Sequence, residues 1–176
     1  MPLNVERFAS CLKPYASQEE IQRLVESCGQ TPTSPEKKAR FTKCLMDNFE
    51  KQFPEDIRFK VMEDCGRRCI GQTTIEKARR IKKNSKNLED LVDGLNRQHI
   101  GGGKMKLEGN RIHAFYERCY CGTVNKTKEK FSSTYCNCGK GWFLELFKEI
   151  LGKPVRVDLV QSIIQGAQDC KFVIYV

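Results

Sequence analysis

The chain has 176 residues, so it is long enough to bury a hydrophobic core without metal or disulfide support. Apolar residues make up 39% of the sequence and charged residues 30%, a balance typical of soluble globular domains. No apolar run approaches the roughly 20 residues of a membrane span, and the N-terminal sequence does not resemble a secretory signal. We therefore expect a cytoplasmic protein without a membrane partner. The 31 Lys and Arg against 22 Asp and Glu give a formal charge of +9, which favours anionic partners.

Helical signals fill the first hundred residues. Ser17 and Glu20 form a capping box ahead of an apolar stripe, and Ser34 followed by Pro35 is typical of a second helix start. Later helices are predicted to start at Pro54, at a second capping box of Thr73 and Glu76, and at Asn87.

The periodicity changes after the glycines at 101–103. Residues 104–121 alternate apolar and polar side chains and predict a β-hairpin whose second strand runs to Cys121. Residues 132–138 are the expected partner strand.

One helix and two strands are expected to close the chain. Gly139 and Gly141 would allow a sharp turn into a helix over 142–151. Strands are predicted over 153–164 and 170–176.

These elements predict an α+β fold. A helical N-terminal region at 1–100 is followed by a β-rich, ligand- and metal-binding region at 101–176, with an antiparallel sheet and a packed helix. We expect the two regions to form one integrated domain.

Four of the ten cysteines lie close together at Cys119, Cys121, Cys136 and Cys138. Two Cys-x-Cys pairs joined by a loop can supply the four thiolates of a tetrahedral zinc site, and zinc is the cofactor that we predict. Cys170 precedes the last strand and is kept as a substitute ligand. The spacing is less specific than that of a zinc ribbon, so buried unliganded thiols, redox thiols and an iron–sulfur cluster remain alternatives.

Cys65 and Cys69 form a second group, in the segment "DCGRRC". The two arginines between them would lower a thiol pKa, which makes either cysteine a candidate nucleophile. Cys65 also continues the apolar stripe of its helix, which favours a core position for it. Three isolated cysteines are expected to stay reduced and to fill core or surface positions: Cys11, Cys28 and Cys44.

Aromatic residues near the cysteines are candidates for a ligand pocket, with an ordinary core role as the alternative. They are Phe115, Tyr116, Tyr135, Trp142 and Phe172. A basic run at 76–86 could contact nucleic-acid phosphates, but it lacks interleaved aromatic residues, so we rank nucleic-acid binding third.

Residues 110–176 resemble the vinyl-4-reductase type of small-molecule-binding domain, found in sensor modules of aromatic-responsive bacterial regulators. The similar features are a cysteine at Cys136, a helix that ends near Gly152, a strand over 154–164 and a "G-x-x-x-C-x-F" motif at 166–172. The resemblance implies an α+β ligand-binding fold, a homodimer and a structural zinc.

Within that zinc set, Cys136 and Cys170 match the family pattern. The other ligands would fall near Leu159 and Ser162, which cannot replace them, so Cys119, Cys121 and Cys138 are the expected substitutes. The leading hypothesis is therefore a sensory or regulatory domain that binds a small molecule and a cysteine-ligated zinc.

The whole chain also resembles small cysteine-rich bacterial proteins near the aminothiazoline-carboxylate hydrolase group, through "CG-x-x-C" ahead of the paired Cys-x-Cys motifs. This resemblance implies an alternative, a hydrolase of a small heterocycle. Cys65 or Cys69 would be its nucleophile, or zinc would activate water. No general base is identifiable from the sequence.

Overall fold

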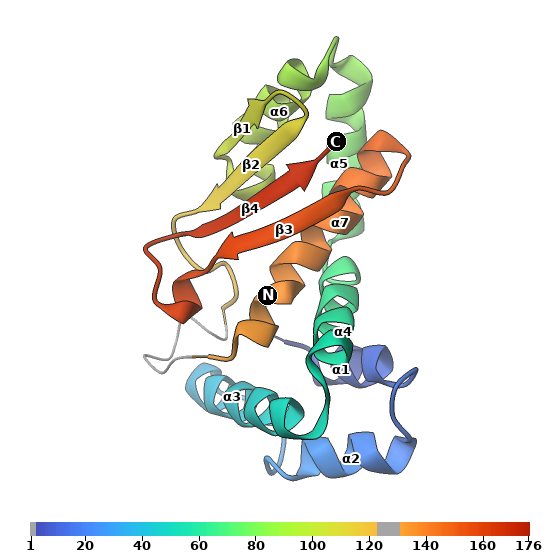
Figure 1. Cartoon of the computed structure of the whole chain (residues 1–176), viewed down its shortest axis with the longest axis vertical. Coiled ribbons are helices and arrows are strands. Elements are labelled where there is room, and N and C mark those ends of the chain that lie inside the picture. The colour runs from blue at the N-terminus through green and yellow to red at the C-terminus, as the bar shows by residue number, and fades with distance from the viewer. Residues whose placement is uncertain (1–2, 123–130) are drawn as a thin grey trace.

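The computed structural model describes residues 3–122 and 131–176 and has an α+β architecture, as predicted (Figure 1). The helices are α1 (Val5–Leu12), α2 (Gln18–Glu26), α3 (Pro35–Gln52), α4 (Glu55–Arg67), α5 (Gln72–Asn84), α6 (Leu88–Arg97) and α7 (Asn137–Leu151). The strands are β1 (Met105–Glu108), β2 (Arg111–Tyr116), β3 (Arg156–Gln161) and β4 (Cys170–Tyr175). Short 3-10 turns are η1 (Ile100–Gly102), η3 (Ser133–Cys136) and η4 (Ile163–Gln165).

Side-chain caps fix most of the helix starts. Ser17 and Glu20 form the predicted capping box, and the Ser34 and Asn87 side chains accept hydrogen bonds from the amides three residues on. The capping box predicted at Thr73 is wrong. Helix α5 begins two residues earlier than predicted, with Gly71 at the N-cap, so Thr73 already lies inside its first turn.

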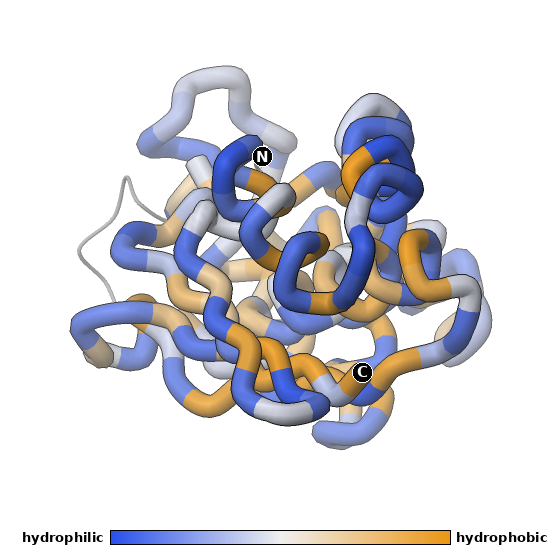
Figure 2. Tube along the Cα trace, turned by 90° about the horizontal axis from the view of Figure 1, so that it is seen from above, coloured by the Kyte–Doolittle hydropathy of each residue, from blue (hydrophilic) through white to orange (hydrophobic). Residues whose placement is uncertain are grey.

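The antiparallel sheet has the order β1-β2-β4-β3, and α5, α6 and α7 cover one of its faces (Figure 1). Alternate residues of β2 and β4 point to these helices, and Ala114 lies opposite Phe172 in the register. The main buried partners on the sheet and on α6 and α7 are Ile112, Ala114, Phe172, Ile174, Leu95, Phe143 and Phe147. Hydrophobic segments gather in the interior of the molecule, and hydrophilic turns lie around it (Figure 2).

Residues of α1, α2, α3 and α4 form a second hydrophobic cluster. Phe8 and Phe49 meet edge to face with ring centroids 5.1 Å apart, and Phe131 and Tyr135 reach into this cluster from the segment before α7. Helices α5 and α6 belong to the first hundred residues in sequence but pack against the sheet.

Helices α4 and α7 cross between the two clusters at a pair of glycines. A Cβ atom on Gly66 would lie 2.8 Å from the carbonyl carbon of Cys138, and one on Gly141 would lie 2.8 Å from the Cα of Glu63. The absent side chains let the two backbones touch. Gly141 therefore serves close packing inside α7, and the turn predicted at Gly139 and Gly141 is wrong because the helix already begins at Asn137.

Two further strand predictions are wrong. Strand β2 ends at Tyr116, so Cys119 and Cys121 follow the strand instead of lying in it. Residues 133–136 form a 3-10 turn, and β2 pairs with β4 instead. Ser132 accepts a hydrogen bond from the Thr134 amide at 3.0 Å, a local contact that competes with strand pairing.

Cys28 and Cys44 form a disulfide between the turn that follows α2 and the middle of α3. The prediction that both stay reduced is therefore wrong. The two cysteines are 16 residues apart in sequence, and the packing of α2 on α3 brings them together, so the sequence alone did not predict the disulfide. Within residues 3–122 and 131–176, no helix has the length and apolar character needed to cross a membrane.

Candidate functional site: a cysteine-lined cavity

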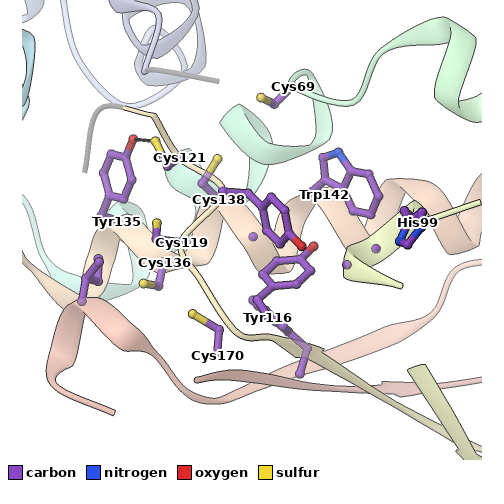
Figure 3. Close-up of a pocket in the computed structure, with 16 residues that line it drawn as sticks. Cys69, His99, Tyr116, Cys119, Cys121, Tyr135, Cys136, Cys138, Trp142 and Cys170 are labelled. Atoms are coloured by element: carbon purple, nitrogen blue, oxygen red, sulfur yellow. Dashed lines mark hydrogen bonds between the residues drawn. The ribbon is translucent and has the colours of Figure 1, made fainter. Parts of the chain in front are cut away.

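A cavity of about 320 Å³ lies between the sheet, the start of α7 and the segment that follows β2. Six cysteines line it, from four separate parts of the chain: Cys69, Cys119, Cys121, Cys136, Cys138 and Cys170. Other side chains in its wall are His99, Tyr116, Tyr120, Tyr135, Trp142, Ile164 and Phe172 (Figure 3). The fold thus collects more thiols at this cavity than the sequence clusters alone contain.

The sheet register and the start of α7 place these thiols. Tyr116 and Cys170 are paired residues of β2 and β4, so both face the cavity from the sheet. Cys136 ends η3, and Cys138 lies in the first turn of α7, next to the crossing with α4. Cys69 follows the end of α4 and reaches the same space from the opposite side (Figure 3).

Burial keeps several of these thiols protonated. It raises the pKa of Cys136 to about 12, because a thiolate there would lose solvation and would be repelled by negative charge at Cys119, Cys121 or Cys170. Burial also raises the pKa values of Cys119 and Cys170. A bound metal cation would reverse this balance, since a coordinating thiol loses its proton.

Neighbouring groups hold the thiols of this set in place. Cys121 Sγ lies 2.7 Å from the Tyr135 hydroxyl, which fixes the segment after β2 against the turn before α7 (Figure 3). The Ile163 amide donates to Cys170 Sγ at 3.4 Å.

Cys69 and Cys138 form a separate thiol pair. The hydrogen bond between the two side chains lowers the pKa of Cys69 to about 6 and raises that of Cys138. Arg7 contributes further, because its positive charge near Cys69 favours the thiolate. Cys69 is therefore the ionised member of the pair near neutral pH.

Cys65 has a different environment from Cys69, although both were candidate nucleophiles. It is only 1% exposed, and its hydrogen bond with Cys11, together with burial, raises its pKa well above the usual range. The sequence prediction of a core position for Cys65 agrees with this burial. Among the cysteines of the described residues, Cys69 alone combines access to the cavity with an activated thiol.

The structure places every predicted pocket residue except Phe115 at the cavity. Tyr135, Trp142 and Phe172 line the cavity, whereas Phe115 does not. Phe115 neighbours Tyr116 on β2 and so points to the opposite face, where the Lys171 ammonium lies 5.9 Å from its ring centroid. Tyr116, which the sequence also offered as a pocket residue, does line the cavity.

Thiol donors of this kind suit zinc in type and number. Within residues 3–122 and 131–176, no three or more His, Cys, Asp or Glu side chains are grouped closely enough to hold a metal ion. The thiols that line the cavity would therefore have to turn toward one another to bind one ion.

Comparison with known proteins identifies a family but no activity. The model described as "Family of unknown function (DUF6144)" matches residues 7–176, nearly the whole chain, so the protein belongs to this family. No curated protein and no solved structure matches it.

Proposed function

We propose that this member of a family of unknown function is a cytoplasmic sensory or regulatory domain that binds a small molecule, with a zinc ion held by cysteines in the same cavity. The observation that carries the proposal is the cavity itself. Its volume of about 320 Å³ lies at the lower end of the roughly 300–1,000 Å³ of ligand pockets.

The cavity walls favour a small, flat and mostly apolar ligand. Tyr116 stacks on Phe143 with ring centroids 5.6 Å apart and meets Phe172 at 5.4 Å, so rigid aromatic rings shape one side. Trp142 closes the side nearest α4. Thiols and tyrosine hydroxyls would supply the few polar contacts that orient a ligand.

The zinc ligands that we propose are Cys119, Cys121, Cys136 and Cys170. Their mutual repulsion as thiolates supports a common cation. Cys138, a first choice from sequence, is engaged with Cys69 instead. When bound, the metal would contribute folding energy by joining the segment after β2 to β4 and α7.

Two measurements on the full chain, purified without a His tag, test this proposal. Elemental analysis should find about one equivalent of zinc per chain, and less than about a tenth of an equivalent of any metal would refute the zinc site. Trp142 is the single tryptophan, so titration with monocyclic aromatic compounds should give a saturable change in its fluorescence. A flat response to the whole panel, with zinc present, would refute the ligand pocket.

A second candidate function, a thiol-dependent hydrolase of a small heterocycle, is favoured by one observation. Cys69 has a lowered pKa and lines the cavity, as a nucleophile must. Iodoacetamide should then label Cys69 at neutral pH faster than it labels the thiol of free glutathione. Labelling no faster than the free thiol would exclude Cys69 as the nucleophile.

A further inference from the structure

Cys69 and Cys138 line the same cavity at the close crossing of α4 and α7, although 68 residues separate them in sequence. One follows the last turn of α4, and the other lies in the first turn of α7. Both side chains also line the cavity, so a small molecule bound there has access to the pair (Figure 3).

The crossing of α4 and α7 holds this pair together. The backbone at Gly66 contacts the backbone at Cys138, and Cys69 lies one helical turn beyond Gly66. Ion pairs join the same helices on either side of the crossing, Lys140 to Glu63 at 2.5 Å and Arg67 to Glu145 at 3.1 Å. A disulfide needs two cysteines whose backbones are already close, and this crossing brings the end of α4 against the start of α7.

The two thiols have unequal surroundings. The Arg7 guanidinium donates to the Arg68 carbonyl at 3.3 Å, which holds this cation beside Cys69. Cys138 is fixed within a helix that packs against α4. Cys69 is therefore the thiol placed to react first, and Cys138 is placed to react with the product.

We propose that Cys69 and Cys138 form a dithiol–disulfide couple that exchanges with small anionic disulfides entering the cavity. The Cys69 thiolate attacks one sulfur of the disulfide RSSR, forming Cys69–S–SR and releasing one thiol, RSH, after protonation. The Cys138 thiol then attacks the Cys69 sulfur, which forms the Cys69–Cys138 disulfide and releases the second RSH. Two protein thiols are thus oxidised, and one disulfide is reduced to two thiols.

This exchange goes beyond the proposed function, since it uses none of the four proposed zinc ligands. Arg7 would favour disulfides that carry carboxylates, because it is the cation beside the attacking sulfur. The two sets of experiments are independent. A negative result for disulfide exchange would not alter the zinc and ligand measurements, and a negative result for zinc or ligand binding would not alter the exchange.

The test uses the reduced full chain, with glutathione disulfide as the probe. After exposure, free thiols are blocked with N-ethylmaleimide, and tryptic peptides are sequenced by mass spectrometry. Trypsin cuts after Arg67 and Arg68, so Cys65 and Cys69 are read on separate peptides, and fragmentation distinguishes Cys136 from Cys138. We expect a Cys69–Cys138 link. Modification without this link, or a link from Cys69 to Cys65, would overturn the proposal.

Variants order the two steps. Cys138→Ser should accumulate glutathione on Cys69, with decay of the adduct at least about tenfold slower than in the wild type. Cys69→Ser should take up no glutathione at Cys138 over the same time. Cys65→Ala is the matched control and should keep the link, since Cys65 is outside the pair. Equal adduct decay in Cys138→Ser and wild type would overturn the resolving role of Cys138, and folding of each variant is checked by circular dichroism.

Discussion

Substituting Gly66 by alanine tests the helix crossing that places the cavity thiols. The added Cβ would lie 2.8 Å from the carbonyl carbon of Cys138 and 2.9 Å from the amide nitrogen of Trp142. These are backbone atoms within α7, so neither can turn aside as a side chain could. Relief requires α4 and α7 to move apart, which would loosen the contact between Cys69 and Cys138.

The magnitude follows from two opposing terms. Overpacking a well-packed interior costs about 1–3 kcal/mol, and more where backbone must move. Replacing a glycine within a helix by alanine stabilises the protein by roughly 0.5–1 kcal/mol, because alanine restricts the unfolded chain and has a higher helix propensity. Because the clash here is with backbone, we expect the free energy of unfolding to fall by about 1–3 kcal/mol net.

Urea unfolding followed by Trp142 fluorescence and circular dichroism measures this change. Gly94→Ala is a matched control, because Gly94 is also inside a helix but its added Cβ would meet the Ile81 side chain instead of backbone. We expect the control to lose less stability than Gly66→Ala. If Gly66→Ala were as stable as the wild type with an unchanged slope in urea, the close crossing would be refuted.

Three further predictions concern stability and reactivity. Cys28→Ser should lower the free energy of unfolding by up to about 3 kcal/mol under non-reducing conditions, since the disulfide to Cys44 closes a loop of 16 residues; an unchanged urea midpoint would contradict this. Alkylation of Cys69 should reach half its maximum rate near pH 6, where the thiolate is half formed. The Cys69 thiolate should contribute its full stabilisation above the ordinary thiol pKa, and this stabilisation should be lost as the pH falls through about 6. A labelling rate that keeps rising into alkaline pH would contradict the lowered pKa. Glu50→Gln should lower the free energy of unfolding in urea by about 1–3 kcal/mol, because it breaks the 2.9 Å ion pair with the largely buried Arg58. A loss below about 0.5 kcal/mol would contradict this, because it is the loss expected for an exposed ion pair.

Local signals made much of the fold predictable. The caps at Ser17, Ser34 and Asn87 depend on residues three positions apart, so they can be read directly from sequence. The hairpin turn near Gly109 has the same local origin. By contrast, the role of Gly141 depends on Glu63 of another helix, and no local pattern separates a packing glycine from a turn glycine.

The candidate site was predictable in composition but not in grouping. The sequence identified the Cys-x-Cys pairs and Cys170, all of which line the cavity. It could not show that Cys138 contacts Cys69, because that contact depends on the crossing of α4 and α7. Phe115 and Tyr116 were both assigned to the pocket as aromatic residues, whereas strand alternation places only Tyr116 there.

Cobalt substitution tests the proposed zinc set most directly. The intensity of thiolate-to-cobalt charge-transfer absorption reports how many cysteines bind the metal, and it is measured for the wild type, Cys136→Ser and Cys138→Ser at one equivalent of Co²⁺. We predict strong absorption in the wild type and in Cys138→Ser, and a marked loss in Cys136→Ser, because Cys136 is a proposed ligand and Cys138 is paired with Cys69. Absence of the absorption in the wild type, or an equal loss in both variants, would contradict this assignment.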